Sequence, residues 1–302
     1  MVSIKKKIID QKVYYYIEHS YRKNGQVHKK EKYLGTKIPR NIEQLKNDLL
    51  LKVYEELWFT KFDKIKDNFK KNQERMPISI QEKELETFAI RFTYTTNKIE
   101  GSKLTHRETA LLLEKGITPA NRPIEDIKEA EQHREVFYDM IAYNKKINIS
   151  TLIHWHKKLF QYTKKDKAGK IREYDVGISG SKHIPPKSFE LDLLIRDFFN
   201  WYNQNKNKVH PVQLAALAHF KFVSIHPFGD GNGRISRLLM NYVLNKNGYP
   251  MLIIDYTQRK SYYTALERSN IKNDESIFTL WFFRRYLKEN KEFLELLPLH
   301  FR

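Results

Sequence analysis

Apolar residues recur every three or four positions over most of this chain, which is the period of a helix with one buried face. The first such run extends from Asn41 to about Met76, and Asn41 is a suitable N-cap residue for it. Later runs predict helices at about 79–100, 105–115, 123–144, 149–161, 188–204, 211–224, 232–246, 258–270 and 275–292. The pattern therefore predicts a mainly α fold.

Short polar signals mark the ends of several of these helices. Ser79 with Glu82, and Thr105 with Glu108, fit the capping box, in which each side chain bonds the backbone N–H of the other residue. Gly101 stands just after a helical run, where a residue in the left-handed conformation commonly ends a helix. These signals predict one helix that ends near residue 100 and another that begins near residue 105.

Two segments break the helical pattern. Residues 13–34 carry tyrosine-rich runs on either side of Asn24-Gly25, and an Asn-Gly pair between β-rich runs is the strongest short-range hairpin signal. Residues 175–186 alternate apolar with small residues and end in Pro-Pro. The sequence thus predicts a small N-terminal β-hairpin module and a second, short hairpin within the helical part.

The composition limits the class of protein. The 302 residues are 40% hydrophobic and 30% charged, which is ordinary for a globular protein. Cysteine is absent, so disulfides and thiol chemistry are excluded. No apolar run approaches the roughly eighteen residues of a membrane span, and the first residues lack the apolar segment of a secretory signal. We therefore expect a cytoplasmic protein that does not enter a membrane.

The charge balance favours acidic partners, because the formal net charge is +19. Lysines occur in nearly every segment, and we favour solvated helix faces or a lysine-rich source proteome over a binding surface as the interpretation of this charge. In the N-terminal hairpin, however, tyrosines interleave with cations, an arrangement that can stack on single-stranded nucleic acid and neutralise it. A protein-docking module, or an edge hairpin whose lysines prevent aggregation, is favoured because the segment is short and lacks a named nucleic-acid motif. A nucleic-acid-associated regulator is the alternative function.

The strongest chemical signal is the run Ile225-His226-Pro227-Phe228-Gly229-Asp230-Gly231-Asn232-Gly233-Arg234-Ile235-Ser236-Arg237. A glycine-flanked loop here becomes a helix, so unpaired backbone N–H groups and the positive end of the helix dipole form an anion cradle. Arg234 and Arg237 lie off the apolar stripe of this helix and point at one polar site. His226 is a candidate general base, since imidazole titrates near neutral pH.

This run matches the pattern HxFx(D/E)GNGRxxR at every specified position, and the chain resembles the Fic family of nucleotidyl transferases. The resemblance extends over roughly residues 80–290 and implies a Fic-type helical bundle with a short β-hairpin flap. We predict three parts: an N-terminal basic β-hairpin module at 1–40, a helical connector at 41–78, and a Fic domain at 79–295 that includes an inhibitory helix.

The resemblance also implies roles within the site. Asp230 is expected to bind Mg²⁺ between the phosphates, since Mg²⁺ commonly uses one carboxylate together with phosphate oxygens and waters. The expected phosphate contacts are Gly231, Asn232, Gly233, Arg234 and Arg237, and the expected adenine contacts are Tyr262, Tyr263 and Asn270. Val176, Ile178 and His183 lie in the segment that resembles the flap, which docks a target segment by strand-like main-chain pairing.

A second motif lies upstream of the loop. Residues 96–101 match the pattern (S/T)xxxE(G/N), which is the inhibitory motif of Fic proteins. The i, i+4 spacing places Thr96 and Glu100 on one helix face, so the Glu100 carboxylate can project from the last turn. The resemblance implies that Glu100 pairs with Arg237 and prevents productive binding of ATP.

The activity implied by the resemblance is protein AMPylation. AMP is transferred from ATP, with Mg²⁺, to a Ser, Thr or Tyr hydroxyl of a target protein, and Glu100 inhibits the transfer. Another nucleotide as donor, or removal of AMP with Glu100 orienting the attacking water, is compatible with the same motifs. The sequence names neither the target protein nor the oligomeric state.

Overall fold

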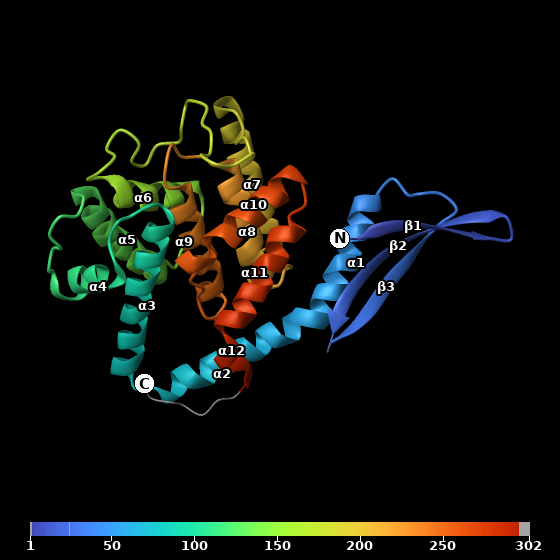
Figure 1. Cartoon of the computed structure of the whole chain (residues 1–302), viewed down its shortest axis with the longest axis horizontal. Coiled ribbons are helices and arrows are strands. Elements are labelled where there is room, and N and C mark those ends of the chain that lie inside the picture. The colour runs from blue at the N-terminus through green and yellow to red at the C-terminus, as the bar shows by residue number, and fades with distance from the viewer. Residues whose placement is uncertain (1, 24, 296–302) are drawn as a thin grey trace.

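The computed structural model describes residues 2–23 and 25–295, and most of them are helical (Figure 1). The mainly α fold predicted from the apolar period is confirmed. A small sheet comes first in the chain, a long helical segment follows it, and a body of packed helices contains the rest.

The N-terminal sheet has three antiparallel strands in the order β1 (Ser3–Ile9), β2 (Lys12–Lys23) and β3 (Gln26–Gly35). The predicted hairpin is β2–β3; Gly25 has a φ of +80°, and Asn24 lies outside the described residues. The prediction of two strands was incomplete, because β1 pairs with β2 along its whole length. Nearly every side chain of β1 is exposed, so this edge strand has no buried face that a pattern could reveal.

The predicted connector consists of α1 (Ile42–Tyr54), a π-helical turn (Glu55–Phe59) and α2 (Thr60–Arg75). Figure 1 shows it as one long segment that leads from the sheet to the helical body. Phe62 and Ile65 of α2 are fully buried, and the Phe62 ring packs edge-on against Phe283 and Tyr286 of the body. This segment therefore contributes to the core as well as joining the sheet to it.

The body comprises α3 (Ile78–Ile99), α4 (His106–Lys115), α5 (Ile124–Ala142), α6 (Ile149–Phe160), α7 (Leu191–Asn205), α8 (Pro211–Ile225), α9 (Asn232–Lys246), α10 (Arg259–Ile271), α11 (Ser276–Glu289) and α12 (Lys291–Glu295), with 3-10 turns at Ser188–Glu190 and Tyr256–Gln258. Helices α8 and α9 pack against each other at its centre. Between Asn232 and Leu244 every residue of α9 except Gly233 is buried. The site motif therefore begins the most enclosed helix of the fold.

Two of the predicted helix ends can be compared directly with the structure. The capping box at Thr105 and Glu108 is confirmed, with both reciprocal bonds present. The box at Ser79 was wrong: the N-cap is Pro77, two residues earlier, the helix begins at Ile78, and no side chain caps it. The Pro77 carbonyl accepts hydrogen bonds from Ile80 N–H and Gln81 N–H, so the first helical turn forms directly after Pro77.

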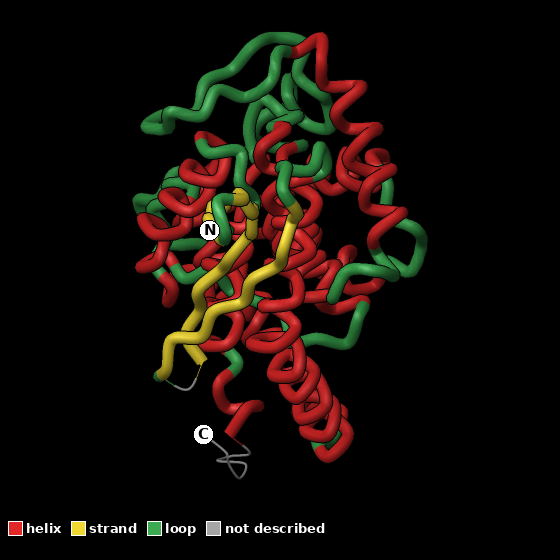
Figure 2. The backbone as a smooth tube through the Cα atoms, turned by 90° about the vertical axis from the view of Figure 1, so that its right-hand side faces the viewer, coloured by secondary structure: helices red, strands yellow, loops and turns green. Residues whose placement is uncertain are grey.

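The short hairpin predicted at residues 175–186 is absent as a strand pair. This segment forms a loop between α6 and α7, seen at the top of the body in Figure 1 and among the green loops at the top of Figure 2. Its backbone N–H groups bond to side chains instead of to a neighbouring strand: Lys182 N–H donates to Glu267, and His183 N–H donates to the Ser181 hydroxyl. The segment with alternating apolar residues is therefore a loop held by individual hydrogen bonds, not by pairing with a strand.

Candidate active site

The loop from His226 to Gly231 connects α8 to α9, and two of its residues have left-handed backbones. His226 ends α8 with a φ of 54°, and Gly231 precedes α9 with a φ of +79°. A Cβ atom at Gly231 would overlap the Phe160 ring, so the close approach as well as the backbone requires glycine. The resulting bend directs the N-terminus of α9 toward the site.

Two buried side chains hold this loop in place. The Asn232 amide accepts a hydrogen bond from Phe228 N–H at 2.9 Å and donates one to the Phe228 carbonyl at 2.8 Å. His156 accepts from Gly169 N–H through Nδ1, so its Nε2 carries the proton and donates to the Asp230 carbonyl at 3.0 Å. Both polar groups of the Asn232 amide are occupied, so its side chain shapes the loop. The phosphate contact that the resemblance implies for Asn232 stays a prediction.

His226 is arranged to act as a base. Its Nδ1 lies 3.2 Å from the Val223 carbonyl, so Nδ1 carries the proton and Nε2 keeps its lone pair. Burial lowers the pKa of His226 below its ordinary value, and Arg172 and His183 act to lower it further; the Val223 carbonyl and Glu100 partly oppose them. The imidazole is therefore neutral near pH 7 and able to accept a proton.

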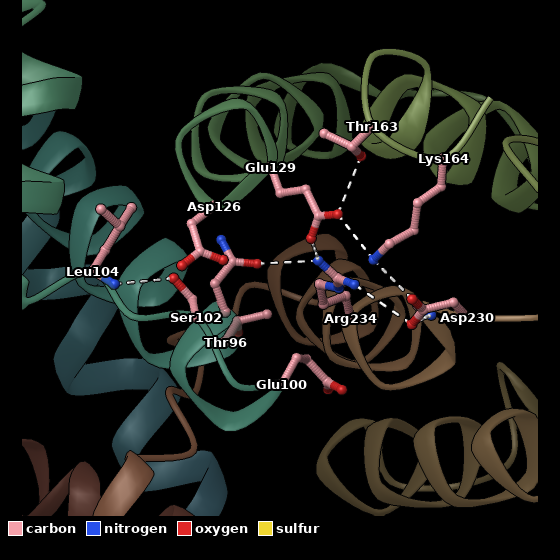
Figure 3. Close-up of polar contacts among 12 residues, drawn as sticks. Thr96, Glu100, Ser102, Leu104, Asp126, Glu129, Thr163, Lys164, Asp230 and Arg234 are labelled. Atoms are coloured by element: carbon pink, nitrogen blue, oxygen red, sulfur yellow. Dashed lines mark hydrogen bonds and ion pairs between the residues drawn. The ribbon is translucent and has the colours of Figure 1, made fainter. Parts of the chain in front are cut away.

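Arg234 lies at the centre of a charge network that links three parts of the chain (Figure 3). Its buried guanidinium forms an ion pair with Glu129 of α5 and approaches Asp230 to 3.6 Å. Lys164, just beyond α6, contacts Glu129 at 2.9 Å and Asp230 at 2.8 Å. Two cations and two carboxylates thus alternate around the mouth of the anion cradle.

Asp230 is suited to bind a divalent cation that also contacts phosphates. Its side chain is 37% exposed, one oxygen accepts from Gly231 N–H, and the other pairs with Lys164. Burial raises the pKa of Asp230, but Arg234 and Lys164 outweigh this effect and lower it, so the carboxylate is ionised. Among the described residues there is no group of three His, Cys, Asp or Glu side chains that could hold a metal ion.

Arg237 and Glu100 form the ion pair expected from the inhibitory motif. The guanidinium is 1% exposed and donates to a Glu100 oxygen at 2.5 Å, and it also donates to the Thr96 carbonyl at 3.3 Å. Burial alone would lower the pKa of Arg237, but the Glu100 carboxylate outweighs burial and raises it. A Cβ atom on Gly233 would overlap the same carboxylate oxygen. Glu100 therefore lies against the first turn of α9, inside the anion cradle.

The end of α3 explains how Glu100 reaches this position. Gly101 has a φ of +104°, Ser102 N–H bonds the Asn97 carbonyl, and Gly101 N–H bonds the Lys98 carbonyl. These two bonds form a Schellman motif, which ends the helix directly after Glu100. The local sequence thereby places the carboxylate at the helix terminus that faces α9.

The three predicted adenine contacts occupy different environments. Tyr262 is 1% exposed, and its hydroxyl lies 3.0 Å from His219 Nε2 and 3.5 Å from Arg237, so it supports the arginine instead of offering a ring face to a ligand. Tyr263 is 45% exposed and its hydroxyl reaches the Ile99 carbonyl beside Glu100. The Asn270 amide donates to Leu266 within its own helix. Only Tyr263 presents an open ring beside the site.

The flap segment, residues 175–186, is fastened to the site at both sides. His183 Nε2 lies 3.3 Å from the Ser224 carbonyl on α8, and Glu267 of α10 accepts from Lys182 N–H at 2.6 Å. Val176 and Ile178 are half-buried in the same loop. The segment therefore lies beside His226, although it contains no strand.

Four side chains that build the site were not predicted from the sequence. Glu129, His156, Lys164 and Arg172 come from elements far from the motif, and all are buried or half-buried. Each is an ordinary residue of an amphipathic helix or a loop, and no local pattern marks it. They are recognised as site residues only by their contacts with motif residues in the folded structure.

Comparison with known proteins agrees with this geometry. The model of the Fic/DOC family matches residues 146–244, which contain α8, the loop and most of α9. Residues 146–244 are therefore similar to the Fic/DOC family. Over 187 residues it is 36% identical to a protein adenylyltransferase Fic of Drosophila ananassae and 37% identical to that of Drosophila melanogaster. These matches cover 59% of this chain and 36% of each relative, so the chain spans about a third of the length of these relatives.

Solved structures share the fold. A Fic domain containing signaling protein from Bacteroides thetaiotaomicron superposes with a TM-score of 0.70 at 24% identity, covering 80% of this chain and 100% of the other. Fic-1 from C. elegans gives a TM-score of 0.71 at 22% identity, covering 84% and 76%. The helical body is therefore a Fic fold. In the described part of the chain, no helix has the length and apolar character to cross a membrane.

Proposed function

We propose that this protein transfers AMP from ATP to a Ser, Thr or Tyr hydroxyl of a target protein, and that Glu100 restrains the transfer. The names of the Drosophila relatives, protein adenylyltransferase Fic, support the activity. The observation that carries the proposal is the Glu100 carboxylate bound to Arg237 within the anion cradle. A site that holds a carboxylate there is built for an anion, and phosphate oxygens are the anions that a nucleotide offers.

Each residue of the site would have its own role in the transfer of the nucleotidyl group. His226 Nε2 accepts the proton of the acceptor hydroxyl, whose oxygen attacks the α-phosphorus. The bond from the α-phosphorus to the oxygen bridging to the β-phosphate breaks, and pyrophosphate leaves. Arg234, Arg237 and the first N–H groups of α9 neutralise the phosphate oxygens, since this reaction depends mainly on positioning and charge stabilisation.

Asp230 would hold Mg²⁺, which when bound neutralises phosphate charge and orients the leaving group. In the structure Lys164 contacts Oδ2 of Asp230 at 2.8 Å. That oxygen becomes available only when the Lys164 ammonium moves aside. Glu129 remains as the partner of Lys164 in either arrangement, because it contacts the same ammonium at 2.9 Å.

Glu100 would inhibit by occupying space and cancelling charge. Its carboxylate lies over Gly233 and neutralises Arg237, so a phosphate cannot take the same position. A charge-assisted hydrogen bond of about 1.5–3 kcal/mol corresponds to roughly ten- to a hundred-fold suppression. We expect Glu100→Gly to raise self-modification by about this factor.

The test compares Glu100→Gly with the parent protein after incubation with ATP and Mg²⁺. Intact mass measures added AMP, and label in the α-phosphate but not in the γ-phosphate of ATP should appear on the protein. The control is Glu100→Gly combined with His226→Ala, which we expect to lower the rate at least a hundred-fold because the general base is lost. Equal rates for Glu100→Gly and the parent would reject inhibition, and γ-label on the protein would reject AMP transfer.

Removal of AMP is the alternative activity of the same site. In that case Glu100 orients a water that attacks the phosphorus of the protein-bound AMP; the bond from phosphorus to the side-chain oxygen breaks, and AMP and the free hydroxyl are released. It predicts that the parent protein strips AMP from self-modified Glu100→Gly protein, whereas Glu100→Gly itself does not.

The tyrosines on the outer face of the N-terminal sheet, Tyr14, Tyr16 and Tyr33, are the basis for proposing a second function. The Tyr33 ring lies 5.1 Å from Tyr16 and 6.2 Å from Tyr14, and Tyr33 is 52% exposed. We propose that this face stacks bases of single-stranded nucleic acid. Binding of a labelled oligonucleotide should fall steeply with salt, weaken in Tyr33→Ala and persist in His226→Ala. Affinity that is unchanged by Tyr33→Ala would reject this function.

A further inference from the structure

Arg172 is a buried cation that the Fic sequence pattern does not include. It lies in the connection between α6 and α7 and is 3% exposed, yet no carboxylate among the described residues lies within ion-pair distance of it. Burying a guanidinium without an ion pair is costly unless its donors are all used. Its hydrogen bonds therefore indicate why it is there.

All three nitrogens of the guanidinium donate to main-chain carbonyls. Nε donates to His226 at 2.9 Å, one terminal nitrogen donates to Tyr174 at 2.9 Å, and the other donates to Pro186 at 2.6 Å. Tyr174 precedes the flap segment and Pro186 is its last residue. One planar group thus joins the two ends of the flap to the residue that carries the base.

The main chain at Arg172 makes the same connection. Its N–H donates to the Pro227 carbonyl at 3.0 Å, and Ile171 pairs with Phe228 as an isolated antiparallel bridge. His226 has a left-handed backbone, which is uncommon for a residue with a side chain and costs free energy. A residue that ends a helix also leaves its carbonyl without an intrahelical partner. Arg172 bonds this carbonyl and holds His226 in the strained conformation.

We infer that Arg172 is a positioning residue for this reaction, because it fixes the main chain of His226 and closes the flap against it. The inference rests on the proposed AMP transfer and extends it to a residue outside the motif. Lysine cannot replace it, since a single ammonium lacks the planar fork that reaches three carbonyls. Misplacement of a reacting group by about 1 Å costs roughly a hundred-fold in rate.

The experiment uses Arg172→Met and Arg172→Lys in the Glu100→Gly background. At saturating ATP, we expect self-modification to fall about a hundred-fold in both variants. ATP affinity, measured by direct titration, should stay within about three-fold, because no atom of Arg172 contacts α9 in the bonds described above. Arg134→Met is the matched control: Arg134 also donates to a carbonyl, that of Leu113, but away from His226. It should keep the parent rate.

A readout that needs no activity separates positioning from folding. Nitrogen NMR of the imidazole gives the pKa of His226, on which Arg172 and His183 act to lower it and Glu100 acts to raise it. Arg172→Met removes a positive charge and should raise this pKa relative to the Glu100→Gly parent, whereas Arg172→Lys should leave it closer to the parent. A parent-like rate with a parent-like His226 pKa in Arg172→Met would overturn the inference. Equal loss of ATP affinity, rate and thermal midpoint, with no change in that pKa, would also overturn it.

The two proposals can fail separately. If Glu100→Gly transfers no AMP, the proposed function fails, while the NMR measurement still tests whether Arg172 controls the state of His226. If Glu100→Gly is active and Arg172→Met is equally active, the positioning role fails and the proposed function stands.

Discussion

The site and the N-terminal sheet contain the same kinds of charged pair in opposite environments. At the site, Arg237 and Arg234 have side chains that are 1% and 3% exposed, and each meets a carboxylate held by a different helix. On the sheet, Lys5 and Lys7 are 54% and 41% exposed where they meet Glu18 and Glu31. Pairs in water gain little because solvent screens them, whereas a buried cation depends on its partner. The difference indicates that ion pairs within the chain order the site, whereas those on the sheet contribute little to stability.

The largest effect in this comparison should come from Glu129→Ala. It leaves the buried Arg234 without its main carboxylate, which we expect to destabilise the protein by about 3 kcal/mol. Urea denaturation measures the change in the free energy of unfolding. Glu131→Ala is the control on the same helix, because Glu131 pairs with Lys128 at the surface, and it should change stability little. A similar decrease in the free energy of unfolding for the two variants would contradict the difference between the buried and the exposed ion pairs.

A second test uses pH to probe the enclosed environment of His226. Burial lowers its pKa below the ordinary 6.5, and protonation removes the base, so AMP transfer should decline only as pH falls below about 6.5. Glu100 acts to raise this pKa, so its removal in Glu100→Gly lowers the pKa further. The pH profile of kcat/KM for Glu100→Gly reports the position of this decline. A decline that begins above pH 6.5 would contradict the burial of His226.

The smallest effect should come from Lys29→Ala on the sheet. Lys29 pairs with Glu18 and lies near Glu31, and it is about half exposed. Loss of this pair should leave the thermal midpoint and the AMP transfer rate of Glu100→Gly unchanged within error. Thermal melting and the labelled-ATP assay provide the two readouts. A clear decrease in the thermal midpoint or in the AMP transfer rate would mean that this exposed pair stabilises the protein or the site, contrary to our expectation.

The helices and the heart of the motif were predictable because local chemistry determines them. The apolar period marked α8 and α9, Thr105 and Glu108 marked a helix start, and Gly101 marked a helix end. The Glu100–Arg237 pair was also expected, but only through resemblance to a known motif. The edge strand β1 was missed, and the flap was wrongly expected to form a hairpin, since neither segment buries the face that its pattern would require.

The sequence by itself determined the chemistry that the loop offers: a base, a carboxylate, two arginines and the glycine bend before a helix. Tertiary structure alone decided which groups act on them. Glu129 stands 105 residues before Arg234, and Arg172 stands 54 residues before His226. A helix pattern records only which face is buried, so it cannot specify a partner on another element. Packing of α5, α6 and the flap around the end of α8 selects those partners, and burial then gives their charges the strength to control the site.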